Sequence, residues 1–227
     1  MTHENEEQGG FLGPVALAYN ALKLVPIRRR FSNADEAFIQ AYGGFPINKI
    51  TVCRTPISRL AGTALNVITY GKWERAMAKY GYDKMFHLFI LIDILDTNKQ
   101  KIITCILQKH DTPRCSLYNE PLSNDTEVMY VEKQYTGNLR TMLQTTQAKM
   151  GTAFWVYDGF KNNCQDFLLN VLGSNGLLSP RLIDFIKQPI KDIANELPSY
   201  TAGVNTGITD TIRRVRTLFG RGLSFPN

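Results

Sequence analysis

Apolar and polar positions along the chain follow two different periods. Several stretches carry apolar residues three or four positions apart, the spacing typical of a helix with one buried face. In residues 32–42, Ser32 or Asn33 precedes acidic residues, which predicts a capped helix start. Pro56 is predicted to open a helix, because proline is favoured in a first turn. The expected helices are 13–25, 32–42, 56–71, 72–81, 139–150, one beginning near Cys164 and ended by Asn175-Gly176, and one across 179–198 broken at Pro189.

Other stretches are β-rich. "FHLFILIDIL" (86–95) and "KIITCILQKH" (101–110) are joined by the polar segment "DTNKQ", a pattern typical of a β-hairpin. Shorter strands are expected at 48–54 and 127–135. Strands and helices are mixed along the chain, with hairpin-type connections, so the sequence predicts an α+β fold: a small antiparallel sheet packed against helices.

Composition bounds the organisation of the chain. It has 227 residues, 44% hydrophobic and 20% charged, the balance of a globular protein with one sizeable core. No apolar run approaches the roughly 20 residues that span a bilayer, and the acidic start is unlike a signal peptide, so we expect a soluble protein made in the cytosol. The predicted parts are a disordered acidic tail (1–10), a helical segment (11–46), the main domain (47–198), and a linker with a basic tail (199–227).

The four cysteines show neither a CxxC pair nor metal-type spacing; they are Cys53, Cys105, Cys115 and Cys164. A cytosolic chain keeps its thiols reduced, so no disulfide framework is expected. The sequence likewise predicts no metal and no cofactor. Each cysteine is then either a small buried hydrophobe or a reactive thiol.

Cys164 has the sequence context of a nucleophile. It follows two asparagines, which are good N-cap residues, and it precedes an apolar helical stripe. The backbone N–H groups of a first helical turn favour a thiolate. A base is also required, and His87 begins an otherwise apolar strand. We therefore expect Cys164 to face His87 as a catalytic pair; the alternative is a core thiol and a half-buried histidine.

A third residue would orient the imidazole. A hairpin that pairs Leu95 with Gln100 would place Gln108 opposite His87 and His110 diagonally on the same face, whereas a slip of one residue would place Lys109 there. Gln165, next to the proposed nucleophile, is expected either to hold the backbone or to be an oxyanion donor alongside the N–H of Cys164.

"DKMFHLFIL" followed by "NNCQDFLLNVL" resembles the circularly permuted papain-like proteins related to lecithin:retinol acyltransferase, which carry a strand histidine and a later Asn-Cys on a helix. Residues 50–220 also resemble an uncharacterised group from large DNA viruses, their smaller relatives and some eukaryotes. The matching stretches are "CRTPISRLAGTALNVITYGKWERAMAKYGYDKMFHL", "YVEKQY", and "NCQDFLLNVLGSNGL" with its downstream "FIKQPIKDI". That group is expected to have Glu-Lys-Asn where this chain has Glu132-Lys133-Gln134.

The resemblance implies a permuted papain-like catalytic domain over 47–198, with flanking terminal helices, and an acyl-enzyme on Cys164. It favours Glu132 as the third catalytic residue, with His110 and Gln108 as alternatives. The implied substrates are lipid esters or (iso)peptides, and the implied setting is a virion or host cytoplasm. The rival interpretation is a non-catalytic virion structural or interaction protein that retains the fold.

The net charge of +6 is concentrated at residues 28–30 and in the C-terminal tail. Residues 208–223 can form a helix with apolar residues on one face and arginines mostly off it, which predicts contact with an anionic membrane surface. The alternative is a helix docked on the protein itself. Nucleic acid is not expected as a partner, because no aromatic-basic stripe accompanies the modest charge. The sequence does not give the oligomeric state, or whether the pairs Gly9-Gly10 and Gly43-Gly44 are processed.

Overall fold

The structure is a computed structural model, and it describes residues 30–57, 71–158, 162–188 and 192–193. The predicted tail 1–10, the helix 13–25, most of the helix 56–71, and the linker and basic tail 199–227 lie outside these ranges.

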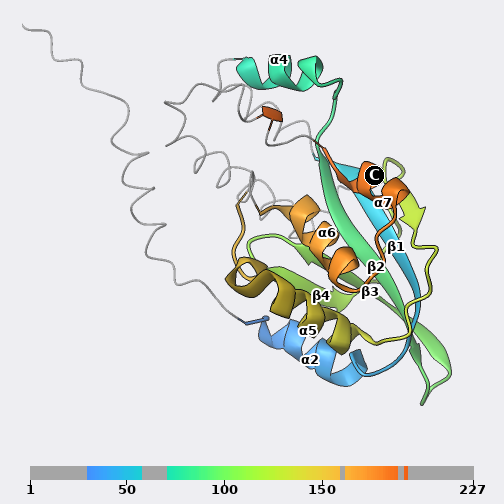
Figure 1. Cartoon of the computed structure of the whole chain (residues 1–227). Coiled ribbons are helices and arrows are strands. Elements are labelled where there is room, and N and C mark those ends of the chain that lie inside the picture. Colours follow the sequence, from blue (N-terminus) through green and yellow to red (C-terminus); the bar gives the residue numbers. More distant parts are fainter. Residues whose placement is uncertain (1–29, 58–70, 159–161, 189–191, 194–227) are drawn as a thin grey trace, which may run out of the picture.

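Within the described ranges, five antiparallel strands form one sheet in the order β4-β3-β2-β1-β5 (Figure 1). The long strands β2 and β3 form the predicted hairpin at its centre, and β1 and β5 extend it on the other side of β2. The strands are β1 (Ile47–Pro56), β2 (Phe86–Asp96), β3 (Lys101–Lys109), β4 (Pro113–Leu117) and β5 (Glu127–Tyr130).

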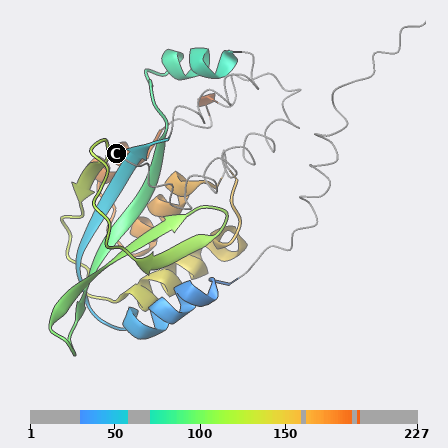
Figure 2. The same cartoon turned by 180° about the vertical axis from the view of Figure 1, so that it is seen from behind.

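Helices α2, α5 and α6 cover one face of this sheet, as the two opposite views show (Figures 1 and 2). We call this the inner face and the other the outer face. Helix α4 lies beyond the N-terminal end of β2. The α+β prediction, an antiparallel sheet packed against helices, is confirmed. The helices of the described ranges are α2 (Asn33–Tyr42), α4 (Lys72–Lys79), α5 (Leu139–Met150), α6 (Cys164–Ser174) and α7 (Pro180–Ile186), with a short 3-10 helix η1 (Gly151–Phe154) after α5.

Side chains alternate between the two faces along each strand, and this alternation assigns the polar residues of the hairpin. The inner face of β2 carries Leu88 and Ile90, both fully buried in the core against α6. Residues directly opposite each other share a face, so Leu107, opposite Ile90, is on the inner face, and Gln108, opposite Phe89, is on the outer face. Lys109 follows Gln108 and is therefore on the inner face. The inner residues of β2 and β3 are Leu88, Ile90, Ile92, Ile94, Ile103, Cys105, Leu107 and Lys109.

The hairpin register differs from the predicted one by two residues. Asp96 pairs with Lys101, so Leu95 pairs with Ile102 and not with Gln100. The Asp96 carboxylate accepts the N–H groups of Asn98 and Lys99 at 3.0 and 3.2 Å, which fixes a longer turn. A shift of two residues keeps every side chain on its face.

Three element boundaries also differ from the predictions. Pro56 is the last residue of β1 rather than the first of a helix, because its neighbours continue the pairing with β2. Strand β5 ends at Tyr130, five residues before the predicted end. Strand β4 was not predicted: it is short, begins at a proline, and exists through its pairing with β3.

Candidate functional site

Cys164 is the first residue of α6, as the sequence predicts. The cap is Asn163, whose side-chain oxygen accepts the N–H groups of Gln165 at 2.8 Å and Asp166 at 3.2 Å. The Asp166 carboxylate in turn accepts the Asn163 N–H at 3.2 Å, which completes a capping box. Cys164 is 6% exposed and belongs to the core. The thiol at the start of the helix is therefore enclosed rather than open to solvent.

The segment before α6 is held by the amide of Asn162. Its nitrogen donates to the carbonyls of Ala153 at 2.7 Å and Val156 at 2.6 Å. Its oxygen accepts a hydrogen bond from the ammonium of Lys109 at 3.1 Å. The two asparagines thus act differently: Asn163 caps the helix, and Asn162 ties the helix start to η1 and β3.

Lys109 is the charged group of this site. Its side chain lies on the inner face, is 0% exposed, and also donates to the Ala153 carbonyl at 2.7 Å. Its ammonium is 5.7 Å from the centre of the Phe167 ring. Burial lowers the pKa of Lys109 from 10.5 to about 8, while the charges of Asp166 and Cys164 oppose that shift. The lysine and the thiol are therefore within electrostatic range of each other.

His87 lies on the outer face of β2. Its Nε2 is 2.8 Å from the side-chain oxygen of Gln108, and its ring lies 5.5 Å from His110 and 5.9 Å from Phe89, centre to centre. These neighbours share the outer face by strand register. The structure thus brings together His87 and two of the residues that were candidates to orient it, Gln108 and His110.

The strand register places His87 on the face of the sheet opposite to the helix that carries Cys164. Residues 86 to 94 of β2 pair with β1 with no irregularity except near Ile47, so the alternation holds through His87. Leu88, next in sequence, faces the core that contains Cys164. Adjacent strand residues point to opposite faces, and the sheet therefore separates the imidazole from the thiol. The predicted pair of facing side chains needs this correction.

Glu132 lies apart from both residues. It follows β5, its side chain is 78% exposed, and it forms an ion pair with Arg181 at 3.0 Å. Val131, the residue before Glu132, donates its N–H to the Ile50 carbonyl on β1. The residue of β1 that is opposite His87 is Thr55, five positions further along the strand. At about 3.3 Å per residue, the two positions on β1 are about 16 Å apart. Glu132 is therefore not placed to orient the histidine, and Gln108 takes that position.

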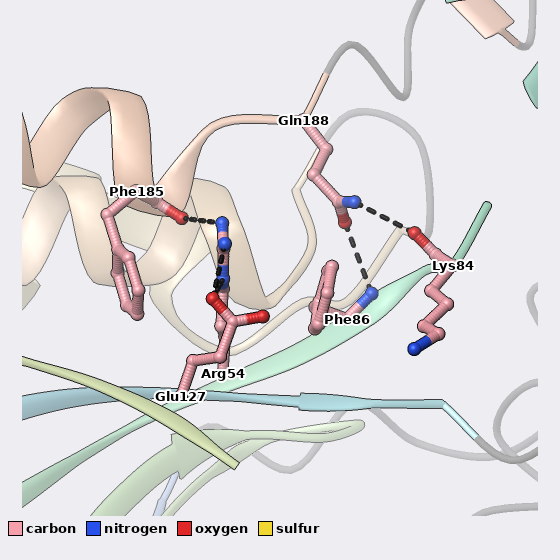
Figure 3. Close-up of polar contacts among 6 residues, drawn as sticks. All are labelled: Arg54, Lys84, Phe86, Glu127, Phe185 and Gln188. Carbon is pink, nitrogen blue, oxygen red and sulfur yellow. Dashed lines mark hydrogen bonds and ion pairs between the residues drawn. The ribbon is translucent and has the colours of Figure 1, made fainter. Parts of the chain in front are cut away.

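Gln165 is buried and joins α6 to the start of β2. Its oxygen accepts the backbone N–H of Gln188 at 2.9 Å, and its nitrogen donates to the Gln188 side chain at 3.3 Å. Gln188 also accepts the N–H of Phe86 at 3.2 Å and donates to the Lys84 carbonyl at 3.1 Å (Figure 3). The amide of Gln165 thus holds the backbone at Gln188, the first of the two roles considered, and these contacts argue against the oxyanion role.

The other cysteines have the environments of core thiols. Burial raises the pKa of Cys53 to about 12, against a hydrogen bond with the Leu91 backbone. A hydrogen bond from Cys115 to Cys105, with the sulfurs 4.0 Å apart, together with burial raises the pKa of Cys115 well above its usual value. All three are fully buried. They are internal references for the reactivity of Cys164.

The described residues contain no group of three or more His, Cys, Asp or Glu side chains arranged to hold a metal ion. In the same ranges, no helix has both the length and the apolar character needed to cross a membrane. No protein-family model, curated protein or solved structure matches the chain.

Proposed function

We propose that the chain is a cysteine-dependent hydrolase or acyltransferase with Cys164 as its nucleophile, acting on lipid esters or (iso)peptides. One observation carries the proposal: the thiol begins a capped helix and lies within electrostatic range of the buried ammonium of Lys109. Both the helix N-terminus and a nearby cation favour the thiolate, which is the reactive form.

The proposed reaction has two steps, acylation of Cys164 and release of the acyl group. The sulfur of Cys164 attacks a carbonyl carbon; a C–S bond forms while the C–O or C–N bond of the substrate breaks. The leaving alcohol or amine takes the proton that the thiol gave up. Water or a second acceptor then attacks the thioester, breaks the C–S bond, and restores the thiol. The N–H groups of Gln165 and Asp166 already bind Asn163, so they are not available to stabilise the oxyanion.

The second candidate is a non-catalytic virion structural or interaction protein that retains the fold. It is favoured by the low exposure of Cys164, 6%, and by the position of His87 on the outer face. In this case the thiol is part of the core. The permuted papain-like connectivity, the viral setting and the membrane contact of residues 208–223 stay predictions; those tail residues lie outside the described ranges.

Alkylation of the native protein separates the two candidates. We expect iodoacetamide to label Cys164 between about pH 6 and 8, while Cys53, Cys105 and Cys115 react only after unfolding, as mass spectrometry of peptides would report. Cys164→Ala should abolish acyl-enzyme formation with a panel of activated esters, anionic phospholipid vesicles and Gly-Gly peptides. Its cost in stability should be about 1 kcal/mol, the common size of a point mutation.

Cys53→Ala is the matched control, because that thiol is also buried but lies on the outer face. It should leave labelling of Cys164 unchanged. If Cys164 reacts only in denaturant, at the same rate as Cys53, the thiol belongs to the core and the structural candidate is correct.

A further inference from the structure

Lys109 occupies a position where an apolar side chain would ordinarily stand. The inner face of β3 carries Ile103, Cys105 and Leu107 before it, and all of them are buried. A lysine is almost never fully buried unless it is paired, because its charge loses hydration. A fully enclosed ammonium at the end of an apolar row therefore requires a specific explanation.

The described contacts of Lys109 lie at the start of α6 and at η1. An ammonium has three protons to donate. Two of them go to the Ala153 carbonyl and the Asn162 side-chain oxygen. Cys164 and Asp166 both attract the charge. The site thus holds a buried lysine with two described acceptors, within electrostatic range of a thiol.

The ammonium is surrounded by groups from several elements. Pro113 on β4 lies opposite Lys109, and neither it nor the inner residues at this end of β2, Leu88 and Ile90, titrate. Helix η1 contributes only a carbonyl oxygen. Helix α6 contributes the two ionisable groups, the Asp166 carboxylate and the Cys164 thiol. The protonation of the lysine is therefore coupled to that thiol and to one carboxylate.

We propose that Lys109, and not His87, exchanges the proton of Cys164 during acyl transfer; the inference rests on the proposed function. The Nζ lone pair of the neutral amine takes the thiol proton, which leaves a thiolate beside an ammonium. As the substrate C–O or C–N bond breaks, the ammonium returns that proton to the leaving group. In deacylation the amine takes a proton from water and gives it back to the departing sulfur.

The electrostatic environment supports this role. Burial brings the pKa of Lys109 to about 8, so a useful fraction is neutral near physiological pH. A lysine with its ordinary pKa would be almost fully protonated there and could not accept a proton. The contacts with Asn162 and Ala153 keep the nitrogen beside the start of α6.

The test measures the rate of Cys164 alkylation against pH in full-length protein, and acyl-enzyme formation alongside it. Lys109→Met should lower the alkylation rate at pH 7 at least about tenfold and move the midpoint of the pH profile upward. Lys109→Arg keeps the charge but cannot accept a proton. It should retain alkylation within about threefold of the wild type, yet lose acyl-enzyme turnover.

Two controls make the result specific. Lys133→Met removes another ammonium that donates to a carbonyl, that of Gly176 at 2.7 Å, but on the surface. His87→Ala removes the imidazole of the outer face. Both should leave the profile unchanged. A profile that shifts with His87→Ala and not with Lys109→Met overturns the inference while the nucleophile stands.

A wild-type Cys164 that never reacts is a different result, because it overturns the proposed function itself. Circular dichroism of each variant checks folding. If Lys109→Met does not fold, the arginine variant decides: turnover equal to that of the wild type overturns the role of Lys109, and retained alkylation with lost turnover supports it.

Discussion

At the scale of single residues, Gln108 and Lys109 show that one position along a strand decides on which face of the sheet a side chain lies. They are neighbours in the chain, yet one contacts the outer-face histidine and the other the segment that leads into Cys164. The thiol and its cap could be predicted from the sequence, because both signals are local. Lys109 was considered only as a residue that a register slip would place beside His87, although that lysine continues the apolar alternation of Ile103, Cys105 and Leu107.

The face of His87 was harder to predict. Strand β2 is apolar on both faces, so its hydrophobic pattern has no clear period. The informative residue was Asp93, which lies an even number of positions from His87 and therefore on the same face of β2. Its carboxylate accepts a hydrogen bond from Thr104 at 2.7 Å. A polar pair of this kind indicates the less enclosed face of a sheet. It would have placed His87 away from the helices.

The low pKa of Lys109 predicts a dependence of stability on pH. The folded value, about 8, lies below the 10.5 of an exposed lysine, so between these values the unfolded chain binds more protons. Stability therefore rises with pH across that interval, and below the folded pKa the full penalty of the buried charge is present. The increment is on the order of 3 kcal/mol at most.

Urea unfolding of the wild type and Lys109→Met at about pH 7, 8, 9 and 10 measures this contribution. The difference between the two proteins should move in favour of the wild type as pH rises, whatever its value at the lowest pH. A difference that stays constant across the whole interval would mean that the lysine titrates as an exposed group does.

At the scale of elements, the helices were the most predictable parts. Ser32 caps α2 through the N–H of Asp35 at 3.2 Å, Asn138 caps α5, and Asn163 caps α6. Capping depends on residues three positions apart, so the sequence carries it in full. Strands depend on partners far along the chain. Strand β4 and the end of β5 were accordingly missed. The register of the β2–β3 hairpin depends on the length of its turn, which the hydrophobic pattern did not specify.

The caps of α5 and α6 provide a matched pair for a prediction. Asn163→Ala and Asn138→Ala each remove a side-chain acceptor from a helix start, and each should cost about 1 kcal/mol in urea unfolding. Only the first should change the chemistry of Cys164. Without the capping box, the first turn of α6 loosens from its position beside Lys109, and alkylation at neutral pH should slow at least about threefold.

Asn163→Asp restores a cap, and it should recover the stability. Equal alkylation rates in Asn163→Ala and Asn138→Ala would show that the order of the α6 start does not govern the thiol.

At the scale of the whole molecule, the α+β class followed from the mixture of strands and helices, but the contacts that close the molecule did not. Arg54 on β1 contacts residues 73 and 131 positions away in the chain. Its guanidinium lies between the rings of Phe86 and Phe185, 4.7 and 4.4 Å from their centres (Figure 3). It also donates to the Phe185 carbonyl at 3.1 Å. No local sequence pattern predicts a contact between residues so far apart in the chain.

Arg54 therefore joins β1, β2, β5 and α7 at one point. Two of its nitrogens donate to one oxygen of Glu127, at 2.6 and 3.0 Å, with the side chains 24% and 49% exposed. Such a surface ion pair contributes at most about 1 kcal/mol, because water screens it. The stacking on two rings and the carbonyl contact add roughly another 1 to 2 kcal/mol.

Arg54→Ala should accordingly lower the free energy of unfolding by about 2 kcal/mol. Arg54→Lys should recover less than about half of that loss, since an ammonium offers no planar surface to the two rings. Arg181→Ala is the control: its ion pair with Glu132 is similar in length, 3.0 Å, but the side chains are 76% and 78% exposed, and its loss should stay below about 0.5 kcal/mol. The four proteins are compared by urea unfolding at one pH.

Equal losses for Arg54→Ala and Arg181→Ala would mean that Arg54 contributes no more to stability than an ordinary surface charge. A larger loss for Arg54→Ala, not restored by lysine, means that the stacked guanidinium holds α7 against the sheet, and with it the segment whose Gln188 joins Gln165 to β2.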